Sequence, residues 1–205
     1  MTEEELEALY EQSAAERDGH TKAVLSSASK KIVVVAGPGT GKTTLFSKML
    51  EGKNGDALTL TFINALVDDL SLGLYGMSDV KTLHGFSASF LKKTISAKVF
   101  PKLCAVIKED AVILMGEDIN FDELFQIGSG KAEHFAFYKA RKDFYGKYYG
   151  FADVVYALGQ YLSANRHKIP AYKQIVVDEF QDFNQAEVAP HRPPCRQKPH
   201  IGCRR

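Results

Sequence analysis

A glycine-rich loop that follows a run of β-branched residues constrains the fold of this chain more than any other feature. The run is IVVV at 32–35, and the loop after it reads AGPGTGKTT. A continuous apolar, β-branched run is typical of a strand buried on both faces of a parallel sheet. Glycines in such a loop let backbone N–H groups surround phosphates, and the N-terminus of the next helix favours negative charge. We therefore predict a strand over 31–37, then a phosphate-binding loop, then a helix.

The residues of this loop have separate expected roles. Lys42 reaches the outer phosphates of a nucleoside triphosphate, and the hydroxyl of Thr43 is a ligand of Mg²⁺. The nucleotide-binding residues that we expect are Gly37, Pro38, Gly39, Thr40, Gly41, Lys42, Thr43 and Thr44. A chance glycine turn is the alternative, and the strand and helix patterns on either side argue against it.

A second apolar run, QIVV at 174–177, ends in an acidic pair. Asp178 is expected to hold Mg²⁺ and Glu179 to activate water. The carboxyl end of this strand should lie beside the phosphate loop in an open α/β sheet, although a solvated strand end is the alternative. We expect ATP and Mg²⁺ as the cofactors, and the pair favours hydrolysis over phosphoryl transfer to a small acceptor.

Further patterns indicate an α/β fold with a parallel sheet flanked by helices. Strand patterns occur at 57–62 and within 79–86, and helical segments separate them, as in βα units with right-handed crossovers. Helical spacing at 2–17 and in TKAVLSSA predicts two helices before the loop. Between 95 and 168 the pattern changes to helices with aromatic faces, which indicates a helical insertion between two strands.

Composition excludes some classes of protein and leaves others open. The 26 Lys and Arg residues nearly balance the 25 acidic residues, so a polyanion such as DNA needs a local patch. The three cysteines form no CxxC pair, which suits a reducing compartment. The acidic N-terminus does not resemble a signal peptide, and no apolar run reaches the length of a membrane span. We expect a cytoplasmic protein with no membrane partner.

Four short motifs, in this order, resemble those of the UvrD/Rep/PcrA-type superfamily 1 DNA helicases. The matching segments are AGPGTGKTT, TFIN (61–64), TLHGF (82–86) and VVDEFQDFN (176–184), which correspond to motifs I, Ia, Ib and II. The resemblance covers roughly residues 20–188. It implies a RecA-like ATP-binding domain that couples ATP hydrolysis to 3′-to-5′ movement on single-stranded DNA.

The resemblance also assigns roles to single residues. It implies catalytic roles for Lys42, Glu179 and Gln181, in which Gln181 senses the γ-phosphate. The residues expected at single-stranded DNA are Thr61, Phe62, Asn64, Thr82, His84 and Phe86. Aromatic rings stack on any base, while hydroxyl and amide groups hold phosphates. A core phenylalanine at position 62 and a structural histidine at position 84 are the alternatives.

The resemblance suggests domain boundaries and an abrupt end. Residues 1–94 with 169–188 would form the ATP-binding domain 1A, and 95–168 the insertion. The segment 189–205 is rich in proline and arginine, so a disordered basic tail is one interpretation. A one-base shift of the reading frame permits PIDLLADKSPILVAGD, which would continue the family pattern. We expect the second RecA-like domain and its arginines to be missing, and the isolated chain to bind Mg²⁺·ATP weakly without motor activity.

Two departures and two rival functions stay open. His20 occupies the position of an adenine-recognising glutamine, so the preference for ATP is open. The aromatic stretch FYKARKDFYGKYYGF is expected to form helix core, with contact to duplex DNA as the alternative. The rival functions are a non-motor P-loop NTPase and a nucleotide-gated module that binds DNA or protein.

Overall fold

The computed structural model describes residues 2–37, 39–52, 55–127 and 130–183. It contains two compact units, which are described separately. The first comprises Met1–Thr59, Ala65–Val80 and Tyr172–Val176, and the second Leu60–Asn64, Lys81–Ala171 and Val177–Arg205. The predicted tail at 189–205, with Cys195 and Cys203, lies outside the described residues. Among the helices described, none is both long and apolar enough to cross a membrane.

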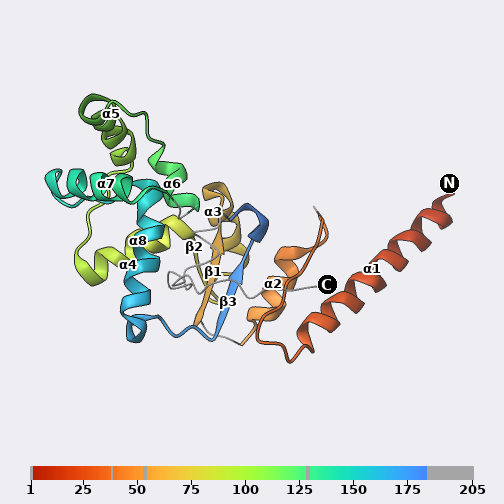
Figure 1. The fold of residues 1–205 in the computed structure, drawn as a ribbon. Helices are drawn as coiled ribbons and strands as arrows, with labels where there is room; N and C mark the ends of the chain where they lie inside the picture. Colours follow the sequence, from red (N-terminus) through yellow and green to blue (C-terminus); the bar gives the residue numbers. More distant parts are fainter. Residues whose placement is uncertain (1, 38, 53–54, 128–129, 184–205) are drawn as a thin grey trace, which may run out of the picture. The chain divides into compact units, whose positions relative to one another are not determined.

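A three-stranded parallel sheet has the strand order β2–β1–β3 (Figure 1). The strands are β1 (Ala57–Thr61), β2 (Asp79–Thr82) and β3 (Gln174–Val177). Two backbone bonds of 2.8 Å fix the register of β1 and β3: Lys173 N–H donates to the Asp56 carbonyl, and Asp178 N–H to the Leu60 carbonyl. Three of the predicted strands and the α/β class are thereby confirmed.

The strand predicted over 31–37 is wrong. Residues 32–37 belong to no helix or strand of the described structure, and Val33 and Val35 are 79% and 96% exposed. A β-branched run favours a pleated, half-buried surface, but pairing depends on a neighbouring strand that covers it. Here no described strand pairs with the run, so its composition alone does not bring it into the sheet.

The first unit contains one long N-terminal helix where two were predicted. This helix, α1 (Glu3–Leu25), begins with a capping box in which Thr2 and Glu5 exchange side-chain to backbone hydrogen bonds of 2.8 and 3.2 Å. Two shorter helices follow, α2 (Lys42–Leu50) and α3 (Asn64–Gly73). One buried cluster of this unit consists of Leu50, Ala57, Leu74 and Val176.

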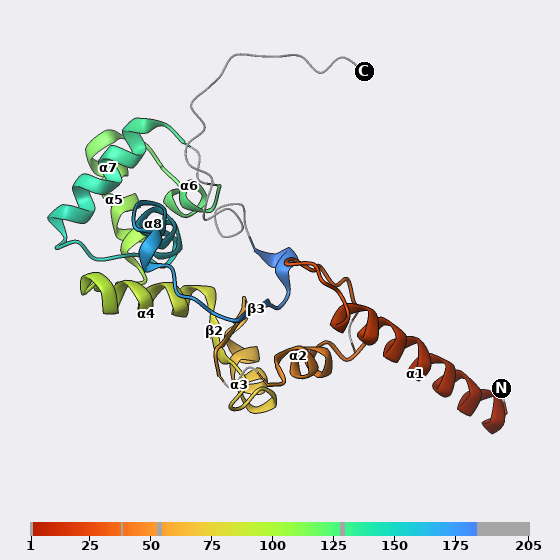
Figure 2. The ribbon, with the colours of Figure 1, turned by 90° about the horizontal axis from the view of Figure 1, so that it is seen from below.

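The second unit is mainly helical. Its helices are α4 (Leu83–Ile95), α5 (Leu103–Met115), α6 (Phe121–Ile127), α7 (Ala132–Phe144) and α8 (Phe151–Ala164), with short 3-10 turns η1 (Arg166–Lys168) and η2 (Phe180–Asp182). Helix α8 contacts α4, α5 and α6, and α7 packs on α5 (Figures 1 and 2). Helix α4, which ends at Ile95, packs against α8. The insertion boundary at residue 95 stays a prediction.

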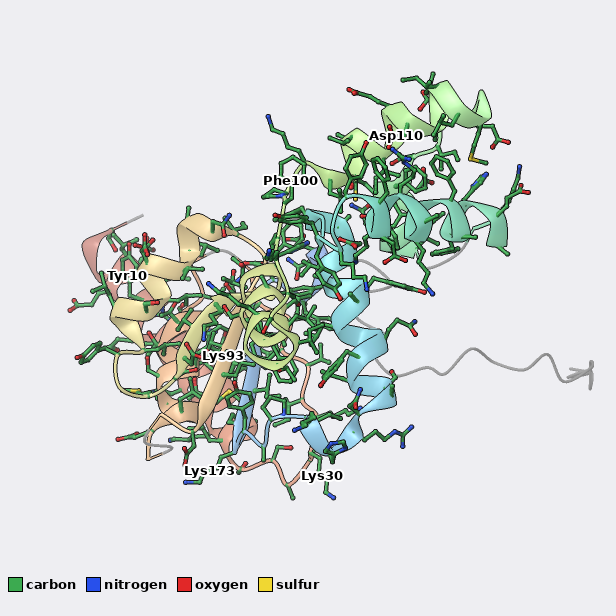
Figure 3. The ribbon with its side chains drawn as sticks, turned by 90° about the vertical axis from the view of Figure 1, so that its left-hand side faces the viewer. Tyr10, Lys30, Lys93, Phe100, Asp110 and Lys173 are labelled. Carbon is green, nitrogen blue, oxygen red and sulfur yellow. The ribbon has the colours of Figure 1, made fainter. Side chains whose placement is uncertain are left out.

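The aromatic stretch before α8 mostly forms core, as predicted. Tyr138 is 3% exposed, and Tyr145 and Tyr148 pack against the same buried cluster. Arg141 Nε on α7 and the Tyr145 hydroxyl both donate to Asp110 Oδ2, at 2.7 and 2.8 Å. Figure 3 shows Asp110 on α5 beside α7. This polar group ties the two helices together.

A second polar cluster is buried where α5, α7 and α8 meet. Lys142 Nζ donates to Asp153 Oδ2 at 2.7 Å, and the Cys104 thiol lies 3.3 Å from the Tyr138 hydroxyl. Burial raises the pKa of Asp153, and the neighbouring Lys142 acts in the opposite direction. Burial likewise raises the pKa of Cys104 to about 12, so this thiol stays protonated near neutral pH. Cys104 is therefore a buried, unreactive residue.

Gly150 is the point at which this cluster tolerates no side chain. A Cβ at Gly150 would lie 2.9 Å from Cys104 Sγ and 3.2 Å from Asp153 Oδ1. We expect Gly150→Ala to lower the free energy of unfolding by about 1–3 kcal/mol, because overpacking displaces neighbours. Chemical denaturation measures the change. Gly19→Ala is the control, since a Cβ there meets no described atom within 4 Å, and equal stability of the two variants would contradict the expectation.

Candidate functional site

The glycine loop has the backbone geometry that a phosphate-binding loop needs. Gly39 and Gly41 have φ values of +71° and +85°, which residues with a Cβ rarely adopt. The Thr40 hydroxyl donates to the Gly37 carbonyl at 2.7 Å and closes the turn. Gly41 is the N-cap of α2, and no described side chain caps this helix. The N–H groups of its first turn can therefore bind an anion.

The backbone of the loop is open at two of its glycines. A Cβ on Gly39 or Gly41 would meet no described atom within 4 Å, so phosphate oxygens can approach the backbone. Lys42 is half-buried in the first turn of α2, and Thr43 and Thr44 are exposed beside it. Pro38 lies outside the described residues. His20, which stands where the resemblance has an adenine-recognising glutamine, is exposed on α1.

The acidic pair follows β3 directly. Asp178 is 7% exposed, and its N–H bond to Leu60 continues the ladder of β1 and β3. Glu179 has φ +49° and ψ +46°, a strained conformation for a residue with a Cβ, of the kind that clusters at functional sites. Gln181 Nε2 donates to Glu179 Oε2. The structure thus brings the predicted base and the predicted sensor into contact.

The glycine loop and the acidic pair belong to different compact units, so the geometry of each is described separately. Lys42 and Thr43 lie in the first unit, and Asp178 and Glu179 in the second. The described residues contain no cluster of three or more His, Cys, Asp or Glu side chains that could hold a metal. Mg²⁺ usually takes one or two protein carboxylates and completes its shell with phosphates and water. The phosphate, metal and catalytic roles stay predictions.

Two of the residues predicted at DNA lie on one cavity of about 370 Å³, Phe62 and His84. Phe62 is 44% exposed, so it is not a core phenylalanine, and its ring meets Phe183 edge-to-face with centroids 6.1 Å apart. The His84 ring is stacked on Phe151, at 3.9 Å and an interplanar angle of 5°. Burial lowers the pKa of His84, which favours the neutral ring.

The other predicted DNA residues have structural contacts or lie elsewhere. Thr61 is fully buried and accepts a backbone N–H bond of 3.3 Å in the turn after β1. Thr82 caps α4 in the same way at 3.0 Å, and Phe86 packs against the core between α4 and α8. Asn64 is exposed at the start of α3. Contact of these four with DNA stays a prediction.

The sequence did not indicate the remaining walls of this cavity. They include Phe125, Phe151 and Tyr156, with Asp122 and Gln126 as polar members. Phe151 ends the aromatic stretch that was predicted as core, yet it is 53% exposed. The residues of α6 gave no signal, because their position depends on how α6 packs against α8.

The fold and the glycine loop together define a P-loop NTPase domain. A family model described as an AAA domain matches residues 20–189, and the chain belongs to this family. Searches of curated proteins and of solved structures found no match.

Proposed function

We propose that this P-loop NTPase domain is the ATP-binding part of a 3′-to-5′ DNA helicase or translocase of UvrD type. The observation that carries the proposal is that Phe62 and His84, from two separate helicase-like motifs, line the same cavity. A non-motor NTPase has no need for an exposed aromatic site built from these two motifs. Single-stranded DNA is the proposed partner, and a second RecA-like domain is needed for full activity.

The nucleotide chemistry follows from the residues of the loop and the acidic pair. Lys42 would neutralise phosphate charge, and Thr43 and Asp178 would each be a ligand of Mg²⁺, which would supply charge stabilisation at the phosphates. Glu179 orients the attacking water. The amide of Gln181 holds the Glu179 carboxylate, and this contact would change when phosphate is released.

The experiment is ATP hydrolysis by the full 205-residue chain with and without single-stranded DNA. We expect Mg²⁺-dependent nucleotide binding and little turnover by these 205 residues, since none of the motifs identified above supplies the arginine that contributes about 10³–10⁵ in rate in P-loop enzymes. Phosphate transfer to a small acceptor would support a non-motor enzyme instead. Tight DNA binding that ATP and Glu179→Gln leave unchanged would support a simple binding module.

Phe62→Ala is expected to weaken binding of single-stranded DNA by about 5- to 150-fold. Stacking of a base on an aromatic ring is worth about 1–3 kcal/mol, and each 1.4 kcal/mol is tenfold in affinity. Fluorescence anisotropy with a labelled oligonucleotide measures the change. Tyr75→Ala is the control, since this tyrosine is 86% exposed and lies outside the cavity. Equal affinities of the two variants would contradict a role of Phe62 at DNA.

A further inference from the structure

The cavity that contains Phe62 and His84 is built entirely within the second unit. One wall is formed by the stacked rings of His84 and Phe151, whose planes differ by 5°. Phe125 and Tyr156 form another, with ring centroids 5.3 Å apart. The volume of about 370 Å³ is in the range of small-molecule sites. Aromatic walls at this size suit a planar heterocycle.

The cavity also has a polar edge, formed by Asp122 and Gln126. These residues are four positions apart on α6, so they lie on the same face of that helix. Both are exposed, in contrast to the adjacent Phe125, which is 5% exposed. An ionised carboxylate only accepts hydrogen bonds, whereas an amide both donates and accepts. The edge therefore presents more acceptors than donors to a molecule in the cavity.

An edge rich in acceptors favours nucleobases that place a donor at their exocyclic position. Cytosine, adenine and guanine carry an exocyclic amino group that donates hydrogen bonds, whereas thymine carries a carbonyl where cytosine has its amino group. Carboxylates accept from the cytosine amino group in protein–DNA complexes. A thymine carbonyl placed against Asp122 would instead oppose one acceptor to another.

We propose that the cavity binds one base of single-stranded DNA and prefers bases with an exocyclic amino group to thymine. The N–H groups of that amino group would donate hydrogen bonds to the side-chain oxygens of Asp122 and Gln126. This inference rests on the proposed function, since it requires a single strand at Phe62. It adds that the affinity for single-stranded DNA depends on the base sequence of the DNA. Stacking between the aromatic walls supplies affinity, and the α6 edge supplies the preference.

The test is the ratio of the affinities of the full chain for labelled oligo-dC and oligo-dT of about 20 nucleotides, measured by anisotropy. We expect oligo-dC to bind about fivefold tighter or more, the lower limit for one good base contact. Asp122→Leu keeps a side chain of similar size but removes the acceptors, so the ratio should fall toward one. Glu109→Leu is the control, because it removes an exposed acid on α5 outside the cavity and should keep the ratio.

The outcomes separate the two levels of inference. Binding of both oligonucleotides with equal affinity would overturn the base preference and leave the proposed function intact. A preference for oligo-dC that Asp122→Leu retains would also overturn it. Failure of the chain to bind either strand would overturn the proposed function, and the base preference with it. Because only a ratio is compared, the general effect of removing a negative charge cancels.

Discussion

Lys142→Ala is expected to lower the free energy of unfolding of the second unit by about 3–5 kcal/mol, as is typical when one partner of a buried ion pair is removed. The side chains of Lys142 and Asp153 are only 16% and 4% exposed, and their charged atoms are 2.7 Å apart. Asp153 Oδ1 is buried and accepts no hydrogen bond from the described residues. Without Lys142, the carboxylate would be left buried with still less compensation.

The loss should depend on pH. Burial raises the pKa of Asp153 in the folded protein above its ordinary value of 3.8. The contribution of Asp153 to the free energy of unfolding is therefore fully present below pH 3.8 and is lost as the pH rises through the folded pKa. Lys142 lowers this folded pKa, and Lys142→Ala therefore raises it further. The difference between wild type and Lys142→Ala should be largest near neutral pH and shrink as pH falls toward 4, where Asp153 takes up a proton.

Chemical denaturation at several pH values measures this difference. Lys139→Ala is the control, because it removes an exposed lysine from the same helix. The double change Lys142→Met with Asp153→Leu should recover much of the stability, since apolar residues can replace a buried ion pair. A pH-independent loss, or one that Lys139→Ala reproduces, would contradict the assignment to the buried carboxylate.

Lys42→Ala is expected to weaken binding of Mg²⁺·ATP by about 10- to 150-fold. A hydrogen bond to a charged group is worth about 1.5–3 kcal/mol, and each 1.4 kcal/mol is tenfold in affinity. Lys42 begins α2 directly after the left-handed Gly41, where the backbone already favours an anion. Titration with a fluorescent ATP analogue, in Mg²⁺ and in EDTA, measures the change.

The matched control for Lys42 is Lys48→Ala. Lys48 lies in the last turn of the same helix, and its Nζ is 3.9 Å from an exposed carboxylate of Asp18. Removing it changes the charge equally but leaves the loop intact. If both variants bound the nucleotide as well as the wild type does, the glycine loop would not be the site of the phosphates.

Local patterns predicted the parts of the fold that depend on neighbours in sequence. The β1, β2 and β3 segments, the start of α2 after the glycine loop and the acidic pair after β3 were all foreseen from short motifs. The run at 32–35 shows the limit of such patterns. Its residues favour a strand, but pairing requires a partner far away in the sequence, and the propensity does not specify one.

Features that depend on packing between distant elements could not be predicted. The Lys142–Asp153 pair connects α7 to α8, and the polar edge of the cavity lies on α6. The ion pair does not follow from spacing within one helix, and the placement of this face of α6 at the cavity depends on how α6 packs against α8. Phe62 and His84, in contrast, were singled out from two motifs, and the structure places them on the same cavity. Their shared position is the strongest structural support for a site that binds DNA.

The most direct test of the proposed function is the affinity of the full chain for a non-hydrolysable ATP analogue, measured with and without saturating single-stranded DNA. Binding at one site of a motor domain changes affinity at the other by the same factor in both directions, typically about 5- to 150-fold. We expect the nucleotide to bind at least about fivefold tighter with DNA present. Equal nucleotide affinity, with DNA shown to be bound, would contradict a domain that couples ATP to a DNA strand.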